Sequence, residues 1–195
     1  MTEESGEERR VSNQLEKFWN ELRGDLEIPY ERDLDISTLE ELWPFCFIIE
    51  ITAQEDGEKV YMYSYIGESI IEAYGDDLTG KSVYAHLIAP YTEELLNKFG
   101  EVSETKKPMA DDSEFVNLQG ALIRYRQGLV PFAYPDGSVG YILGAMKWRS
   151  YNVFGREDGK RFVSGKPIHE EDFQGAPKKV EDSVEERLLK NNDFS

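Results

Sequence analysis

Residues 60–80 read VYMYSYIGESIIEAYGDDLTG, and the two halves of this stretch follow different patterns. The first half, residues 60–66, is rich in aromatic and β-branched side chains, which favour a strand with both faces at least partly covered. In the second half the apolar side chains, Ile70 and Tyr74 among them, fall three to four residues apart, which predicts a short helix. Gly75 ends that helix, and the Asp-Asp-Leu-Thr-Gly turn after it can start a second one. The stretch therefore predicts strand, helix, turn and helix.

Four further stretches have the length and composition of strands, and their order decides the fold class. An Asp-Gly pair at residues 56–57 joins the first of them to the strand described above, which predicts an antiparallel hairpin. A helical pattern that contains Leu95, Leu96 and Phe99 separates this hairpin from the other three. The four stretches are residues 45–52, 109–118, 121–132 and 138–148. This order predicts an α+β fold with a five-stranded antiparallel sheet and helices on one face.

A clear amphipathic helix precedes these strands. Apolar side chains recur at helical spacing on one stripe, and Gly24 supplies a stop. The stripe consists of Val11, Leu15, Phe18, Trp19 and Leu22. It can cover the chain's own sheet, or it can also meet the same stripe of a second copy, which would make it the interface of a homodimer.

Composition divides the chain of 195 residues into three parts, of which one has a core. Residues 1–10 are almost all polar and are expected to be flexible, and residues 11–149 form the single domain. Residues 150–195 turn to Gly, Lys, Glu and Asp and are expected to be a poorly ordered acidic tail. In that tail Val180, Val184 and Leu188 have the spacing of one short helix that could dock a partner.

The formal net charge of −17 limits the partners that the chain can have. Such an excess of carboxylates repels phosphate backbones and anionic lipid surfaces, so neither nucleic acid nor membrane is an expected partner. No apolar run approaches the ~20 residues of a membrane helix, and the acidic N-terminus lacks the pattern of a signal peptide. The expected location is the cytoplasm.

Residues that could carry catalysis or hold a metal are scarce. The chain has one cysteine, Cys46, and two histidines, of which only His86 lies inside the predicted domain. These cannot supply the four N or S ligands of a structural zinc site, and Cys46 lies in an apolar run where a buried, inert thiol is expected. Residues 75–82 have the spacing of a phosphate-binding loop, but their two aspartates would repel the phosphates and no apolar strand leads directly into them. No catalytic residue and no metal site are predicted.

A diffuse set of residues from Leu15 to Trp148 resembles a known family. Its members are Leu15, Phe18, Trp19 and Leu22 before Arg23-Gly24; Ile28-Pro29, Arg32, Asp33 and Ile36; Leu39, Leu42 and Trp43-Pro44; Gly67, Tyr74-Gly75 and Leu78-Thr79-Gly80; and Pro131 with Asp136-Gly137. This set resembles the PAS domains, in particular the short stand-alone PAS proteins of bacteria. The resemblance implies a sensory or regulatory module of signal transduction.

The resemblance also implies a place for a small ligand, in a cavity between the sheet and its helices. The side chains that would line it are Tyr61, Tyr63, Tyr65, Ile70, Tyr74, His86, Arg124, Tyr125 and Tyr141. Because strand side chains alternate, half of them must point away, and a tyrosine-rich sheet can equally be a core. A flavin or a haem is not expected, because the chain lacks the reactive-cysteine helix of light-sensing relatives and offers only His86 as an axial ligand. The cofactor is otherwise left open.

The sequence thus predicts a non-catalytic, cytoplasmic sensory module that forms a homodimer and acts through contact with a signalling partner protein. A small molecule in the cavity would be its signal. The first alternative is a small-molecule carrier with the same fold, and the second is an enzyme of unknown class.

Overall fold

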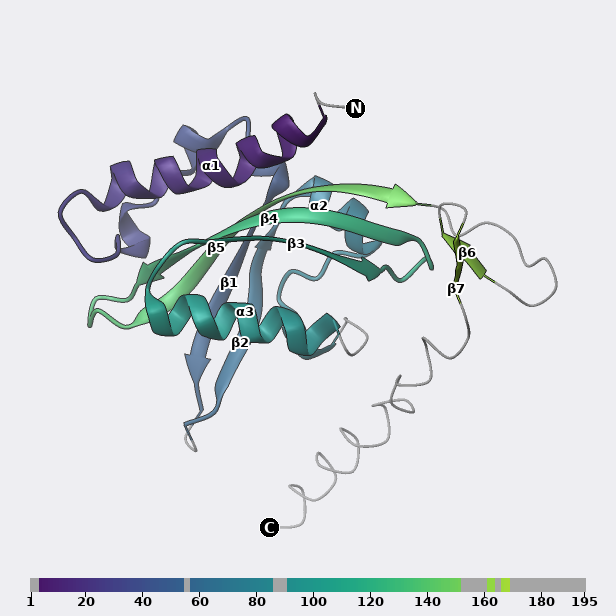
Figure 1. The fold of residues 1–195 in the computed structure, drawn as a ribbon. Coiled ribbons are helices and arrows are strands. Elements are labelled where there is room, and N and C mark those ends of the chain that lie inside the picture. The colour runs from purple at the N-terminus through teal and green to yellow at the C-terminus, as the bar shows by residue number, and fades with distance from the viewer. Residues whose placement is uncertain (1–3, 55–56, 86–90, 152–160, 164–165, 169–195) are drawn as a thin grey trace, which may run out of the picture.

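The computed structural model describes residues 4–54, 57–85, 91–151, 161–163 and 166–168. Five strands form one antiparallel sheet in the order β2-β1-β5-β4-β3 (Figure 1). They are β1 (Cys46–Ala53), β2 (Lys59–Ile66), β3 (Met109–Val116), β4 (Leu122–Ala133) and β5 (Val139–Tyr151). A separate two-stranded sheet pairs β6 (Arg161–Val163) with β7 (Lys166–Ile168). The five-stranded antiparallel sheet predicted from the sequence is confirmed.

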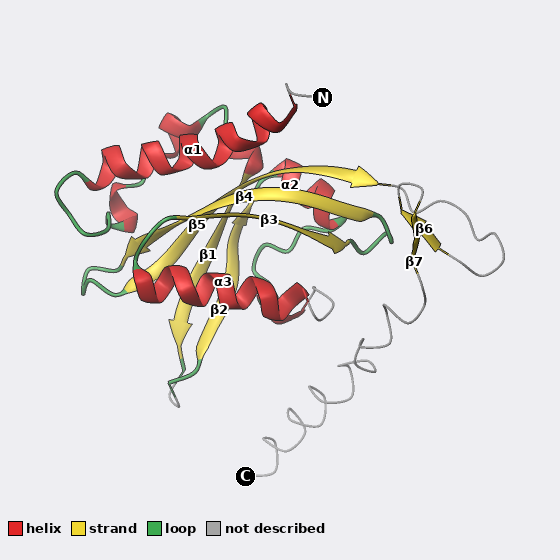
Figure 2. Cartoon of the chain, viewed as in Figure 1, coloured by secondary structure: helices red, strands yellow, loops and turns green. Residues whose placement is uncertain are grey.

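Helices cover both faces of this sheet (Figure 2). The α-helices are α1 (Glu4–Arg23), α2 (Glu68–Tyr74) and α3 (Tyr91–Thr105). Four 3-10 turns, η1 (Glu31–Asp33), η2 (Ile36–Leu39), η3 (Trp43–Phe45) and η4 (Val83–Ala85), complete the helical elements of the described chain. Helices α2 and α3 share one face, as predicted, and α1 with the segment that follows it covers the other.

The sheet therefore separates two hydrophobic cores. Phe47, Tyr63 and Phe99 belong to the core on the α3 face, and all three are at most 1% exposed. Leu15 and Phe132 belong to the core on the α1 face and are equally buried. Both faces of the central strands are covered over much of their length, which explains why β1 reads as a near-continuous apolar run.

Helix α1 is anchored to the sheet by its apolar stripe. Val11, Leu15 and Trp19 are 0–3% exposed, and the indole Nε1 of Trp19 donates a hydrogen bond to the carbonyl oxygen of Pro131 at 2.7 Å. The helix begins at Glu4, well before the predicted start at residue 11.

The stripe thus covers the chain's own sheet, which confirms one of the two interpretations of the sequence. Val11, Leu15 and Trp19 are buried against β4 and β5, which leaves little of their surface for contact with a second copy. Phe18 and Leu22 keep part of their surface exposed. The homodimer itself stays a prediction.

Residues 36–39 form a 3-10 turn capped by Asp35, whose Oδ1 accepts hydrogen bonds from the backbone N and the Oγ of Ser37. Strand β5 continues to Tyr151, so the sheet extends beyond the predicted domain boundary at residue 149. The predicted tail helix around Val184 lies outside the described residues.

The chain that follows β2 folds back onto the edge of the sheet. Gly75 ends α2 with a φ of +83°, and its backbone N donates to the carbonyl oxygen of Ile71. The chain then returns along β2, where Gly80 N donates to Tyr63 O at 2.7 Å and Tyr63 N donates to Lys81 O at 3.0 Å. These bonds satisfy part of the open edge of β2, which would otherwise be free to pair with another chain.

Candidate functional site

Four of the predicted ligand-binding residues come together between the sheet and helices α2 and α3. Tyr61, Tyr63, Ile70 and Tyr74 are 0–6% exposed there. The hydroxyl of Tyr63 donates a hydrogen bond to the hydroxyl of Tyr74 at 3.3 Å. Burial raises the pKa of both phenols above the usual value, so both stay neutral. Each tyrosine therefore satisfies its polar end with the other.

Aromatic rings fill the space in which a ligand was expected. The ring of Phe47 lies 6.4 Å from those of Tyr63 and Phe99, measured between centroids. Tyr74 and Phe115 lie 5.2 Å apart. Such tilted and edge-to-face contacts are the geometry in which aromatic side chains pack a core. In the described part of this region, four of the residues predicted to line a cavity thus belong to a packed aromatic core.

A β-bulge sends Tyr65 to the other face. Ile48 pairs with Tyr65 but Ile49 pairs with Tyr63, so Ser64 is an extra residue in β2 and the alternation of side chains shifts there. Tyr65 consequently stacks on Trp43, with ring centroids 4.2 Å apart, in the core on the α1 face. Its assignment to the ligand site was wrong because alternation was extended through the bulge.

Three more of the predicted ligand-binding residues lie away from this core, or only at its border. Tyr141 belongs to the α1 face, where its ring meets that of Tyr134 at 5.1 Å. Arg124 is exposed and pairs with Glu114 at 2.8 Å, so it is no cavity residue either. Tyr125 packs at the border of the aromatic core against Phe115. His86 lies outside the described residues.

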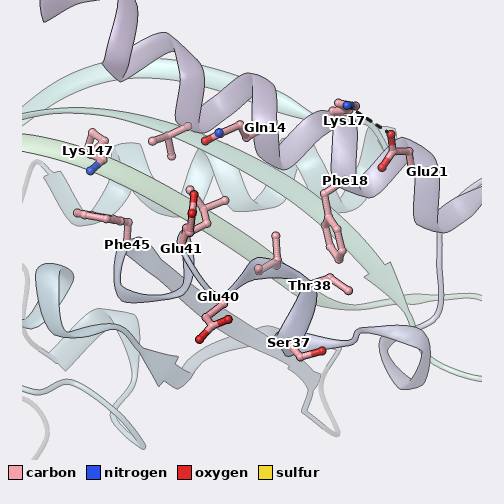
Figure 3. Close-up of a pocket in the computed structure, with 13 residues that line it drawn as sticks. Gln14, Lys17, Phe18, Glu21, Ser37, Thr38, Glu40, Glu41, Phe45 and Lys147 are labelled. Carbon is pink, nitrogen blue, oxygen red and sulfur yellow. Dashed lines mark ion pairs between the residues drawn. The ribbon is translucent and has the colours of Figure 1, made fainter.

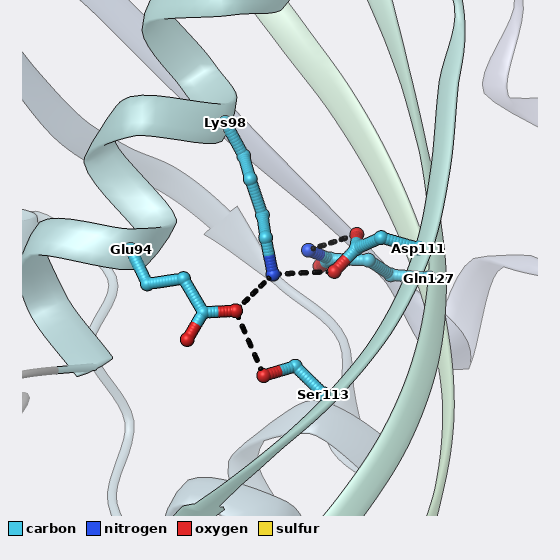
Figure 4. A network of polar contacts seen from close by, with 5 residues as sticks. All are labelled: Glu94, Lys98, Asp111, Ser113 and Gln127. Atoms are coloured by element: carbon cyan, nitrogen blue, oxygen red, sulfur yellow. Dashed lines mark hydrogen bonds and ion pairs between the residues drawn. The ribbon is translucent and has the colours of Figure 1, made fainter.

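A cluster of polar side chains joins α3 to the sheet, and sequence inspection missed it. We call it the α3 clamp; it comprises Glu94, Lys98, Asp111, Ser113 and Gln127 (Figure 4). The ammonium group of Lys98 donates to Asp111 Oδ2 at 2.5 Å and to Glu94 Oε1 at 2.7 Å. Ser113 Oγ donates to Glu94 Oε1 at 2.9 Å, and Gln127 Nε2 donates to Asp111 Oδ1 at 3.0 Å.

The α3 clamp is an ionic network in which Lys98 keeps its charge. Burial works against that charge, but the hydrogen bonds to Asp111 and Glu94 outweigh it, and the pKa of Lys98 is raised above its usual value. The hydrogen bond from Lys98 in turn lowers the pKa of Glu94. A protonated lysine is no general base, so the arrangement fits a structural tie. The sequence pattern that could have predicted the α3 clamp is the position of Lys98, which lies near the buried residues Leu95, Phe99 and Val102 of α3.

An open groove of about 600 Å³ lies on the α1 face, between α1 and the 3-10 turns that follow it (Figure 3). Its apolar lining consists of Val11, Phe18, Leu39, Leu42 and Phe45. Its polar lining consists of Gln14, Lys17, Glu21, Ser37, Thr38, Glu40, Glu41 and Lys147. We call this feature the α1 groove.

Several charged side chains that line the α1 groove have partners of their own. Lys17 and Glu21 form an exposed ion pair at 3.7 Å, which is worth at most about 1 kcal/mol. At the other end the ammonium group of Lys147 lies 3.2 Å from the ring centroid of Phe45, a cation–π contact. In the sequence, Phe18 is the residue that points to this groove, because it is an aromatic residue at the border of the apolar stripe of α1. In the structure its side chain is partly exposed.

Titratable side chains elsewhere offer little chemistry. The described residues hold no group of three or more His, Cys, Asp or Glu side chains that could bind a metal ion. Cys46 is fully buried, its thiol donates to the carbonyl oxygen of Leu42 at 3.4 Å, and burial raises its pKa to about 12. Nor does any helix of the described chain have the length and apolar composition needed to cross a membrane.

The comparison with protein families identifies the fold. A family model described as PAS domain (PAS_5) matches residues 8–147, and the chain therefore belongs to this PAS family. No curated protein matches the chain.

Similar solved structures include PAS and LOV domains. A light-oxygen-voltage domain studied with a flavin analogue is 13% identical, with a TM-score of 0.45, over 59% of this chain and 84% of that one. The N-terminal domain of a diguanylate cyclase with a PAS/PAC sensor from Marinobacter aquaeolei is 20% identical, with a TM-score of 0.39, over 52% and 93%. The PAS-B domain of Drosophila melanogaster Cycle with bound ethylene glycol is 15% identical, with a TM-score of 0.40, over 53% and 99%.

Proposed function

We propose that this PAS domain is a non-catalytic regulatory module that acts through protein contact, with the α1 groove as its contact surface. One observation carries the proposal: the space between the sheet and α3 is packed with the chain's own aromatic rings, whereas the α1 groove is open. A signal received by this domain then acts at its surface.

The composition of the α1 groove suits a protein partner. Protein interfaces combine an apolar centre with a polar, solvent-accessible rim. Phe18, Leu39 and Leu42 supply the apolar part of the lining here, and the exposed side chains of Glu21 and Glu40 supply charge. A second copy of this chain is one such partner, which would give the homodimer, and a signalling protein is the other. The proposed setting is the cytoplasm, where a single buried thiol such as Cys46 stays reduced.

The absence of catalysis is part of the proposal. The largest group of titratable side chains described above, the α3 clamp, has its ammonium group bonded to two carboxylates. The one thiol is buried and protonated at neutral pH. Neither offers an activated nucleophile or a base beside a cleft.

A small-molecule carrier is the second candidate, because one observation favours it. The α1 groove, at about 600 Å³, falls within the range of ~300–1,000 Å³ that is usual for ligand pockets.

Mass spectrometry of the purified protein, native and then denatured, tests the proposal, together with an absorption spectrum of the same sample. A polypeptide mass without an added small molecule and without visible absorption fits a protein-contact module. A small molecule released on denaturation, one per chain, supports the carrier instead.

The native mass also reports the homodimer, and two variants locate its interface. Phe18→Glu places a charge in the α1 groove, and Leu118→Glu places one on a side chain that is 54% exposed elsewhere. If two copies meet through the α1 groove, Phe18→Glu gives a monomer and Leu118→Glu stays a dimer. Equal behaviour of the two variants contradicts that interface.

A further inference from the structure

Four basic side chains form a square on strands β4 and β5. Arg124 lies opposite Arg149, and Arg126 lies opposite Lys147, so the two pairs are neighbours along both strands. Directly opposed residues of an antiparallel pair project from the same face of a sheet. We call this set the basic block.

The basic block lies on the face that carries α1. Two residues further along each strand, and therefore on the same face, Gly128 lies opposite Ala145. A Cβ on Gly128 would lie 3.0 Å from the Cα of Ser12 in α1, which fixes the face. The block therefore continues the α1 face toward the end of β5 at Tyr151. The side chain of Arg124 is 53% exposed, and the other three are partly exposed.

The charge of this region contrasts with the rest of the chain. Residues 122–151 contain the four basic residues and a single acidic one, Asp136, in a chain with a net charge of −17. Like charges directly opposite each other destabilise a sheet. The four basic side chains on one face of the sheet therefore need negative charge nearby to offset their mutual repulsion.

Strand β3 supplies part of that negative charge. Glu114 Oε2 accepts a hydrogen bond from Arg124 Nε at 2.8 Å, and Asp112 lies opposite Arg126. Exposed ion pairs of this kind are worth at most about 1 kcal/mol, so carboxylates of another molecule can compete for the guanidinium group. Arg126, Lys147 and Arg149 also have partners within the chain. The basic block is therefore defined by its charge and its position on the sheet.

We propose that the basic block binds an acidic segment of a partner protein. The inference rests on the proposed function and deepens it, because it names the chemistry of the partner. Side chains two residues apart on a strand are about 6.6 Å apart, so an extended segment with a carboxylate at every second position matches the spacing of Arg124 and Arg126. A long polyanion such as nucleic acid would extend over the surrounding excess of carboxylates and be repelled by them. A short acidic segment interacts only with charges within the Debye length, which is about 10 Å at 0.1 M salt.

Fluorescence anisotropy with a labelled ten-residue peptide of alternating Glu and Ser tests the inference. The protein is compared with Arg124→Glu and with Lys107→Glu, a matched charge reversal at an exposed lysine after α3. Arg124→Glu is expected to weaken binding about tenfold, the size of one lost charge-assisted hydrogen bond. Lys107→Glu is expected to change it less than about twofold, and raising the salt concentration is expected to weaken binding to the unchanged protein.

Arg124→Gln is the second variant, because it removes the charge without adding repulsion toward Glu114. A loss of peptide affinity in this variant, with an unchanged melting temperature, supports the inference. Three results overturn it: no binding of the peptide to the unchanged protein, equal losses for Arg124→Glu and Lys107→Glu, or tighter binding of a single-stranded DNA of equal length. None of these three results contradicts the proposed function. That function is contradicted by a different result, the release of a small molecule when the purified protein is denatured.

Discussion

At the scale of single residues, burial decides what a side chain can do. Cys46 is the only thiol in the chain, and its place in an apolar run predicts a buried, inert side chain. The structure agrees: the side chain is fully buried, and burial raises its pKa to about 12. The thiolate, which is the reactive form, is therefore scarce at neutral pH.

The reactivity of Cys46 gives the first prediction. A disulfide reagent at pH 8 is expected to modify the folded protein at least about a hundredfold more slowly than the protein in guanidinium chloride, because a buried thiol must first be exposed by opening of the structure. Absorbance of the released thiol measures both rates. Similar rates would mean that Cys46 is accessible in the fold.

The second prediction concerns Trp19 and its neighbour Phe18. Trp19→Ala is expected to lower the free energy of unfolding by about 3–5 kcal/mol, because a buried indole and its hydrogen bond to Pro131 are lost. Phe18→Ala is expected to cost less than about 2 kcal/mol, because part of that side chain is exposed. Urea unfolding measures both, and an equal cost would contradict the orientation of α1.

At the scale of elements, α3 is held to the sheet by charge as well as by apolar contact. Lys98→Met is expected to lower the free energy of unfolding by about 1–3 kcal/mol, since it leaves Asp111 without its cation. Glu94→Gln is expected to cost less than about 1 kcal/mol, because the Glu94 side chain is 49% exposed. Urea unfolding at pH 7 separates the two, and the reverse order would contradict the geometry of the α3 clamp.

The α3 clamp also predicts a dependence on pH. The pKa of Glu94 is lowered in the fold, so its contribution is present above the unfolded value, near 4.5, and is lost as the pH falls through the folded value. The pKa of Lys98 is raised, so its contribution is fully present below about 10.5 and is lost only at higher pH. The stability difference between the protein and Glu94→Gln is thus expected to shrink between pH 6 and pH 3. A constant difference in urea unfolding would contradict it.

The elements show where sequence inspection succeeds and where it ends. The length and composition of apolar runs located all five strands, and helical spacing located both long helices, because burial selects apolar side chains at the positions that face a core. They could not locate the bulge at Ser64, since one extra residue leaves the composition of β2 unchanged while it moves Tyr65 to the other face. The candidate site depended on that alternation, and it was therefore predicted less well than the fold.

At the scale of the whole molecule, the dominant quantity is the net charge of −17. Mutual repulsion of the carboxylates opposes the compact state, and salt screens it. The melting temperature is therefore expected to rise when sodium chloride is increased from about 0.02 M to about 0.3 M. Scanning calorimetry measures this, and a falling melting temperature would mean that the ion pairs outweigh the repulsion.

The two cores share the strands that separate them, and this couples the two sides of the molecule mechanically. Leu129 packs in the core on the α3 face, and the adjacent Val130 packs in the core on the α1 face. A displacement of β4 that loosens one of these side chains also moves the other, because a single backbone carries both. A displacement of α1 can therefore be transmitted to α3 across the thickness of the sheet, without a linker or hinge between the two helices.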